Sequence, residues 1–324
     1  MHVHSTFKLA LSVLFAGVVP LASSQTTYPN KPIRMIIPYV PGGGTTVMGR
    51  LVGQRLSEPW DQHVILDNRP GAGGIVGAET LARAQPDGYT IMFTSVSDHL
   101  LVAQLQKPPY DAAKDFAPVA TVAIAERIMV VHPSLPAASL KELIALARSK
   151  PQHLNYASLG NGSTAHVGTE LFLMLAGIRM THIPYKGGAQ AVTDLVAGQV
   201  QVYLGSIASM GAFINSGRLK PVAITGKSRA TALPQVPTFS ESGLPGFDIK
   251  LWYGVLAPFG TPLPIVNKMS EEIIRIVNST DFKNTILGLG ITPFTVPREQ
   301  MAEMMRSEAA RYAEVIIAAK IAPN

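Results

Sequence analysis

Short apolar runs rich in β-branched residues recur along the chain and alternate with stretches whose apolar positions follow helical spacing. Such short runs are typical of buried strands, and one of the intervening stretches, 46–56, has apolar residues every three to four positions. The alternation predicts an α/β fold built as layers with parallel sheets. The runs that predict strands are 33–37, 64–66, 90–94, 128–131, 154–157, 200–204, 222–225 and 253–256.

Two further helices have clear signals at their ends. Ser139 stands three residues before Glu142, which is a capping box and predicts a helix over 140–148. Near the C-terminus, Pro297 opens a stretch that extends to Ile321 with apolar residues at steps of three or four. This stretch predicts a long terminal helix that packs by one face.

The first residues indicate export rather than fold. Lys8 precedes an apolar run over 9–21, and Ala22, Ser23 and Ser24 resemble a cleavage site with small residues. We interpret 1–24 as a secretory signal peptide. The apolar run is too short for an ordinary membrane span. We therefore expect a periplasmic protein secreted through a cleavable signal peptide.

The composition and the spacing of particular residues argue against several kinds of functional site. The chain has no cysteine, so disulfides, thiolate nucleophiles and cysteine metal sites are excluded. The formal net charge is +6, without runs of basic residues interleaved with aromatics, so nucleic acid is not an expected partner. The histidines after the leader show no ligand spacing, and the segment 71–76 lacks a complete dinucleotide fingerprint. We expect neither a metal nor a cofactor.

Two glycine-rich loops carry the main functional signal. Residues 42–46 read Gly-Gly-Gly-Thr-Thr and residues 160–164 read Gly-Asn-Gly-Ser-Thr, and each loop leads into a predicted helix. A helix start exposes unpaired amides and partial positive charge, and glycine lets a ligand approach the backbone closely. The pair predicts an anion held between two domains. The alternative is that both are ordinary strand-to-helix turns.

An enzymatic interpretation is weaker. Ser158 resembles the serine of a nucleophile elbow, but Tyr156 occupies the position of the first glycine. His166 follows the serine and would be the base. A secreted hydrolase or isomerase of carboxylic acids using Ser158 and His166 stays open as an alternative. A ligand-sensing subunit of a signalling system is a further one.

Successive motifs along the mature chain resemble those of the Bug family, the periplasmic receptors of tripartite tricarboxylate transporters. The match runs in order over essentially the whole mature chain. The motifs lie at 28–33, 41–45, 68–74, 87–90, 156–163, His166, 184–187, 194–200 and 252–254.

The resemblance implies a type II periplasmic binding protein, with two α/β domains joined by two crossing strands. Domain 1 would comprise 25–131 plus 252–324, and domain 2 would comprise 132–251, with crossings near 128–131 and 252–256. It implies a receptor rather than an enzyme. Its partners would be a small organic carboxylate and membrane permease subunits, and we expect the receptor itself to be a monomer.

The resemblance also assigns the ligand site to loops of both domains. One departure concerns position 46, where the family commonly has aspartate and this chain has threonine. Without that carboxylate a ligand ammonium loses a ready partner, so we expect poor binding of amino acids and a preference for plain mono- or dicarboxylates. The assigned residues are Tyr39, Pro41, Gly42, Gly43, Thr45, Thr46, Thr94, Ser95, Ser158, Gly160, Asn161, Gly162, Ser163, His166, Tyr185, Lys186 and Gly187.

Overall fold

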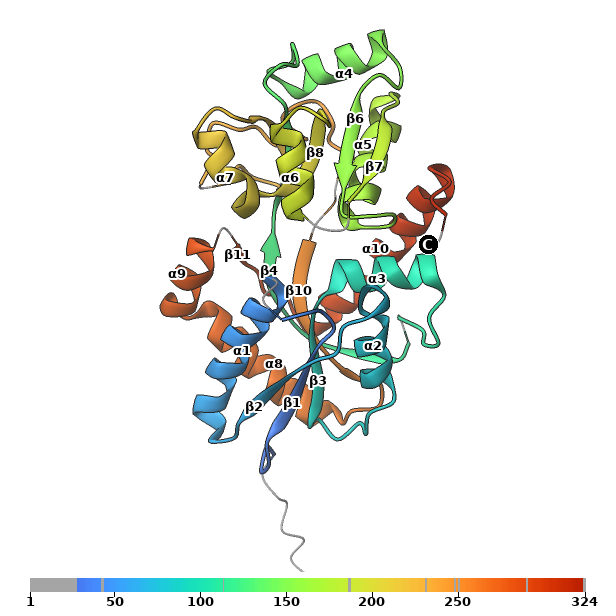
Figure 1. Cartoon of the computed structure of the whole chain (residues 1–324). Helices are drawn as coiled ribbons and strands as arrows, with labels where there is room; N and C mark the ends of the chain where they lie inside the picture. Colours follow the sequence, from blue (N-terminus) through green and yellow to red (C-terminus); the bar gives the residue numbers. More distant parts are fainter. Residues whose placement is uncertain are drawn as a thin grey trace, which may run out of the picture.

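The structure is a computed structural model, and it describes residues 28–41, 44–112, 114–185, 188–230, 232–247, 249, 251–289 and 291–322. Its strands form two separate sheets, each covered by helices (Figure 1). We call the six-stranded sheet and its helices the first lobe, and the five-stranded sheet and its helices the second lobe. The predicted signal peptide and Gly42, Gly43, Lys186 and Gly187 lie outside the described residues.

The sheet of the first lobe has the order β11-β4-β10-β3-β1-β2. Strand β1 pairs in parallel with β2 and β3, whereas β10 is antiparallel to β3 and β4, and β11 is antiparallel to β4. The sheet is therefore mixed rather than parallel as predicted. Its strands are β1 (Ile33–Ile37), β2 (Val64–Asn68), β3 (Thr90–Ser95), β4 (Phe116–Ala125), β10 (Leu251–Pro258) and β11 (Thr292–Pro293).

Helices cover both faces of this sheet. One face carries α1, α8 and α9, and the other carries α2, α3 and α10, with the 3₁₀ turn η1 before α2. The bounds are α1 (Gly44–Trp60), η1 (Ala72–Gly74), α2 (Ile75–Ala82), α3 (Val96–Gln106), α8 (Leu263–Asn278), α9 (Thr280–Gly288) and α10 (Arg298–Ala318).

The sheet of the second lobe has the order β7-β6-β8-β5-β9 and is also mixed, because β5 is antiparallel to both of its neighbours. Helices α6 and α7 pack on one face, and α4 and α5 on the other. The strands are β5 (Arg127–Val131), β6 (Asn155–Ser158), β7 (Thr181–Pro184), β8 (Val202–Ser206) and β9 (Lys220–Ile224). The helices are α4 (Leu140–Ser149), α5 (Thr164–Ala176), α6 (Gly188–Val196) and α7 (Ile207–Asn215).

The chain first changes lobes at Glu126, the residue between β4 and β5. All of β5 pairs within the second sheet, so Arg127–Val131 belongs with the second lobe. The predicted boundary after Val131 had placed these residues in the first domain. The return lies between β9 and β10, close to the boundary expected before Trp252. Because β4 and β10 are antiparallel neighbours, the two connections between the lobes run side by side.

One apolar cluster extends across both lobes. It joins side chains of α3 and α10 to side chains of α5, including Leu105, Phe172 and Tyr312. Helices α10 and α5 are in direct contact, and Figure 1 shows α10 rising from the first lobe beside the second. The C-terminal helix therefore packs on both lobes, in addition to the crossing strands.

All eight predicted strands are present, 33–37 with the predicted ends and the other seven with shifted ends, and the helices predicted over 46–56, 140–148 and 297–321 and after the second glycine loop are present too. Strands β4, β7 and β11 were not predicted. Within the described residues, no helix combines the length and the apolar character that a membrane span requires.

Candidate functional site

The loop between β1 and α1 is braced from the neighbouring strand. The side-chain amide of Asn68, the last residue of β2, donates to the Tyr39 carbonyl at 2.8 Å and to Thr46 Oγ1 at 3.2 Å. Thr46 Oγ1 in turn donates to the Val40 carbonyl at 3.2 Å. The buried Thr46 hydroxyl is thus committed to the loop itself. Sequence reasoning had not assigned Asn68 this role.

The other predicted residues of the first lobe differ in exposure. Pro41 is exposed and Thr45 is half-buried in the first turn of α1. Thr94 and Ser95 are fully buried at the end of β3. Ser95 Oγ accepts from the Asp98 amide at 3.3 Å and caps α3. Thr94 is therefore packed inside the first lobe, and Ser95 fixes the start of α3.

The loop between β6 and α5 is held by side chains of its own. Ser158 Oγ accepts from the Gly160 amide at 3.1 Å, and His166 Nδ1 accepts from the Gly162 amide at 3.0 Å. Ser163 caps α5 by accepting from the His166 amide, and its hydroxyl donates to the Gly160 carbonyl at 2.9 Å. Gly160 and Gly162 have φ values of 105° and 71°, which favour glycine. These hydrogen bonds fix the loop in one shape.

Three amides of this loop remain for a ligand. Among the described residues, the backbone N–H groups of Asn161, Thr164 and Ala165 have no hydrogen-bond acceptor. Thr164 and Ala165 begin α5, where amides have no partner within the helix. The donors left for an anion are therefore these three, whereas the Gly160 and Gly162 amides are already engaged.

His166 stacks on His182, which sequence reasoning had not paired with it. The two ring centroids are 3.8 Å apart, and Ser158 Oγ lies 2.6 Å from His182 Nε2. The parallel pairing of β6 with β7 sets Tyr156 opposite His182 and so brings these rings together. The proposed partnership of Ser158 with His166 is wrong, because His182 occupies that place.

The environment of the histidine pair favours neutral imidazoles. Burial lowers the pKa of His182 to about 4, and burial together with the adjacent His182 ring lowers the pKa of His166 to about 4. Burial alone also lowers the pKa of His99, in the first lobe, to about 4. Tyr156, whose ring stacks on His182, donates its hydroxyl to Glu170, and burial raises the pKa of that carboxyl.

Stability should therefore fall on mild acidification. A histidine with a pKa near 4 when folded and 6.5 when unfolded stabilises the fold fully above pH 6.5 and loses that contribution as the pH falls toward 4. We expect His99 alone to cost about 2 kcal/mol of unfolding free energy between pH 7 and pH 5, with a smaller part from buried His166 and half-buried His182. Urea unfolding at several pH values measures this loss.

The substitution His182→Gln should remove only the smaller share of the pH dependence that this residue contributes, whereas His153→Gln, at an exposed position of the same lobe, should leave the pH dependence unchanged. A pH profile that is flat from 7 to 5 in the unsubstituted protein would contradict the assignment.

Two tyrosine hydroxyls lie beside the starts of α1 and α6. A Cβ atom on Gly44, the first residue of α1, would lie 3.5 Å from the hydroxyl of Tyr253 on β10. A Cβ atom on Gly188, the first residue of α6, would lie 4.0 Å from the hydroxyl of Tyr203 on β8. Burial raises the pKa of both tyrosines, so both hydroxyls stay protonated and can donate.

The predicted Tyr185 has another role. Its hydroxyl donates to the Asp194 carboxylate on α6 at 2.9 Å, and its amide donates to the Ser158 carbonyl at 3.0 Å. Tyr185 is buried and fastens α6 to the second glycine loop. Its side chain is thus used within the second lobe.

The second glycine loop also contacts the first lobe. A Cβ atom added to Gly162 would lie only 2.0 Å from Cδ1 of Leu105, on α3. Leu105 is buried in the apolar cluster that spans both lobes. The loop that leads into α5 therefore rests directly on α3 across the boundary between the lobes.

Arg127 lies at the start of α5 although sequence reasoning did not select it. It is the first residue of β5, only 5% exposed, and its Nη2 donates to the hydroxyl of Thr164. Its charge lowers the pKa values of Tyr203 and Tyr253 against the effect of burial, so the guanidinium lies near both hydroxyls. No feature of the local sequence distinguishes Arg127; only the change of lobe at Glu126 places it there.

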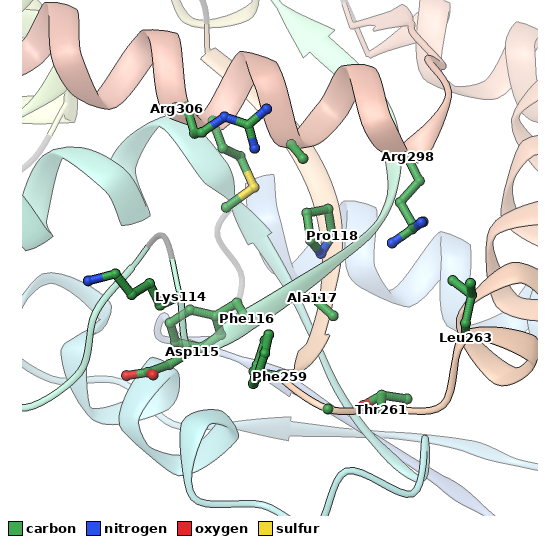
Figure 2. Close-up of a pocket in the computed structure, with 13 residues that line it drawn as sticks. Lys114, Asp115, Phe116, Ala117, Pro118, Phe259, Thr261, Leu263, Arg298 and Arg306 are labelled. Atoms are coloured by element: carbon green, nitrogen blue, oxygen red, sulfur yellow. The ribbon is translucent and has the colours of Figure 1, made fainter.

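The pocket in Figure 2 is separate from these loops. It has a volume of about 700 Å³ and lies at the start of β4, at the strand end remote from Glu126. Figure 2 shows it below α10, with the ring of Phe259 inside it. It contains none of the predicted site residues. Its lining is Lys114, Asp115, Phe116, Ala117, Pro118, Phe259, Gly260, Thr261, Leu263, Arg298, Ala302, Met305 and Arg306.

Two mixed α/β sheets joined by adjacent crossings, with helix starts of both lobes facing the junction, define a type II periplasmic binding protein. The predicted fold class is confirmed. No group of histidine and acidic side chains suited to a metal is found within the described ranges.

The chain belongs to the tripartite tricarboxylate transporter receptor family, whose model matches residues 48–321. This is a family of non-catalytic periplasmic solute-binding receptors, which confirms the Bug resemblance and the interpretation as a receptor rather than an enzyme.

Relatives cover nearly the whole chain. Protein BugT of Bordetella pertussis is 35% identical over 312 residues, which is 95% of this chain and 96% of BugT. The structure of Rpa4515 of R. palustris with adipate is 32% identical with a TM-score of 0.78, covering 92% of this chain and all of that one. MatC from Rhodopseudomonas palustris with bound malate is 30% identical with a TM-score of 0.73, covering 89% of this chain and all of that one. Structural relatives thus bind carboxylates.

Proposed function

We propose that this protein is an extracytoplasmic receptor that captures a small organic carboxylate between its lobes and delivers it to a membrane permease of the tripartite tricarboxylate type. The observation that carries the proposal is the set of free amides of Asn161, Thr164 and Ala165 at the start of α5, in the loop that rests on the first lobe. Unpaired amides at a helix start favour an anion. The adipate and malate complexes of structural relatives support a carboxylate as that anion.

Binding requires both lobes on energetic grounds. Micromolar affinity corresponds to about 8 kcal/mol, whereas a helix terminus supplies about 0.3 to 1 kcal/mol at a surface and each charge-assisted hydrogen bond about 1.5 to 3 kcal/mol. Donors from several loops must therefore act together in a site of low water content. A ligand that binds the closed arrangement better shifts the population toward it.

The same proposal includes export and a simple assembly. The predicted signal peptide, 1–24, would direct the chain to the periplasm and be removed there, and the receptor would act as a monomer. Membrane permease subunits would recognise the closed receptor.

A thermal-shift screen of the mature protein against aliphatic mono-, di- and tricarboxylates and aromatic acids tests the function. Binding stabilises the native state by RT ln(1 + [L]/Kd), so a ligand at 100 times its Kd adds about 2.7 kcal/mol. We expect at least one carboxylate to raise the melting temperature and to bind stoichiometrically without turnover. A protein that binds no acid in the screen, or that converts one, would refute the proposal.

Amino acids should bind more weakly than their deaminated analogues. In the first loop Thr46 replaces the carboxylate that would receive an ammonium group, and its hydroxyl is already bonded to Val40 and Asn68. An ammonium group left without a partner pays its desolvation cost. Calorimetry should therefore give succinate and glutarate at least about tenfold tighter binding than aspartate and glutamate.

The control variant for this comparison is Asp98→Asn. Asp98 is half-buried at the start of α3 and acts electrostatically on Tyr253, so its charge would also act on an ammonium group bound beside that hydroxyl. Removing its charge should leave the dicarboxylates at least as tightly bound. Equal or tighter binding of aspartate and glutamate by the unsubstituted protein would contradict the expected preference.

A further inference from the structure

Arg127 combines deep burial with an unused hydrogen-bond donor. The residue is 5% exposed, and its Nε atom is fully buried without a hydrogen-bond partner. Its Nη2 donates to the Thr164 hydroxyl, which is neutral, and its backbone amide donates to Thr225 Oγ1 at 3.0 Å. Within the described part of the chain, no acidic side chain forms an ion pair with Arg127. Among the described residues, the guanidinium therefore has a free N–H and a neutral hydrogen-bond partner only.

The surroundings make this uncompensated charge costly. An arginine stays protonated in proteins, and a buried charge without a counter-charge is strongly destabilising. Arg127 also lies at the N-terminus of α5, where the helix dipole adds partial positive charge of the same sign. A negatively charged ligand at this place would offset both the buried charge of Arg127 and the dipole of α5, and would so stabilise the folded state.

The free donor of Arg127 lies beside the free amides at the start of α5. Thr164, which accepts from Arg127, is also one of the three residues whose backbone N–H lacks a partner at the start of α5. The charge of Arg127 also acts on Tyr203 and Tyr253, where it lowers the pKa values against the effect of burial. A carboxylate at the start of α5 therefore meets a positive side chain as well as the free amides.

We propose that Arg127 is a ligand-binding residue, whose Nε–H donates to a carboxylate oxygen held by the amides of Thr164 and Ala165 at the start of α5. The proposal rests on the carboxylate-receptor function and adds to it the residue that selects for the charge of the ligand. A carboxylate satisfies the fork of the guanidinium, whereas the corresponding primary amide offers a neutral oxygen and brings N–H groups toward a cation. Arg127 therefore distinguishes acids from their amides.

Two variants test this role, with adipate and its diamide, adipamide, as first probes and the strongest acid of the screen as a second. Arg127→Met keeps the length of the side chain and removes the charge, and Arg127→Lys keeps the charge and loses the fork. In calorimetry, Arg127→Met should weaken binding of the acid about 10- to 150-fold, the range of one charge-assisted hydrogen bond. Arg127→Lys should retain part of that affinity.

A matched control is available at Arg55. This arginine forms an ion pair with Asp281 of α9, so Arg55→Met makes the same chemical change at an arginine that already has an acidic partner. We expect its affinity for the acid to stay within about threefold of the unsubstituted protein, as is usual for a surface ion pair.

Two readouts separate a binding role from a structural one. If Arg127 binds the ligand, ligand-free Arg127→Met should melt at the same temperature as the unsubstituted protein or higher, because an uncompensated buried charge has been removed. The preference for the acid over the amide should also collapse. If Arg127 is only structural, the variant melts lower and keeps its affinity and its preference, which overturns the inference.

The remaining outcomes are also decisive. If the unsubstituted protein binds carboxylates and Arg127→Met binds them within threefold, the receptor function stands and the role of Arg127 is refuted. If the unsubstituted protein binds no carboxylate, both fail. Should Arg127→Met not fold, Arg127→Lys decides by its affinity and by its ratio of acid to amide binding, and an unchanged ratio and affinity refute the role.

Discussion

Gly162→Ala should weaken carboxylate binding at least about tenfold and lower the unfolding free energy by about 2 to 5 kcal/mol. Two costs combine at this residue. Alanine in the left-handed conformation that Gly162 adopts, with φ of 71°, costs about 1 to 2 kcal/mol. The new Cβ atom would also lie 2.0 Å from Leu105 Cδ1, and overpacking of this kind costs about 1 to 3 kcal/mol.

The loss of affinity follows from the position of the clash. Leu105 belongs to α3 of the first lobe, whereas Gly162 leads into α5 of the second. Leu105 is buried in the apolar cluster, so its side chain has little room to move aside, and we expect the loop to deform around the Gly162–His166 bond or the lobes to shift apart. Each response displaces the free amides at the start of α5. Calorimetry and urea unfolding measure the two effects.

Gly217→Ala provides a closely matched control. Gly217 has the same φ of 71°, lies in the second lobe, and has open space where a Cβ atom would be. Gly217→Ala should lose only the stability that alanine costs in the left-handed conformation, and it should bind the carboxylate with unchanged affinity. Leu105→Ala should restore part of the binding when added to Gly162→Ala, because it removes the clashing atom. Normal binding by Gly162→Ala alone would show that the contact between α3 and the loop does not matter for the ligand.

Glu308→Ala should destabilise the protein by about 2 to 5 kcal/mol. The carboxylate of this α10 residue accepts from Trp252 Nε1 at 2.6 Å and from the Tyr312 hydroxyl at 2.9 Å. Ser97 Oγ also donates to it at 3.3 Å. Trp252 and Tyr312 are fully buried, so the substitution takes the Glu308 acceptor away from two buried donors, and each loss costs about 1 to 3 kcal/mol.

Exposed Glu303 on the same helix supplies the comparison. It forms a surface ion pair with Arg306 at 2.5 Å, so Glu303→Ala should change stability by less than about 1 kcal/mol. Glu308→Gln keeps acceptor oxygen and shape and should fall between the two. Urea unfolding of the three variants ranks them, and equal stability of Glu308→Ala and Glu303→Ala would refute the role of the network.

Helices and strands could be predicted from the sequence where they depend on neighbouring residues. Runs such as 33–37 and the capping box at Ser139 depend on neighbouring residues, and the structure has the predicted elements there. Strand β4 was missed because it is rich in alanine and contains Pro118, which weakens a strand signal, although its neighbour β10 keeps it in the sheet. Strand β7 is four residues long and only partly buried.

The parts of the site that were missed depend on contacts distant in sequence. Asn68 braces the first loop because β2 pairs with β1, and His182 reaches Ser158 because β7 pairs with β6. Arg127 lies at the start of α5 because the chain changes lobes just before it. None of these relations is expressed in residue spacing. The glycines, in contrast, were found from sequence because their conformational requirement is local.

The packing of α10 against α5 sets the route by which a solute arrives. The lobes are tethered along two lines, the neighbouring strands β4 and β10 and the apolar seam between these helices. Both tethers restrict separation of the lobes on the side where they lie. If the proposed ligand site lies between the lobes, we expect it to open on the side remote from α10, and a solute to enter and leave there.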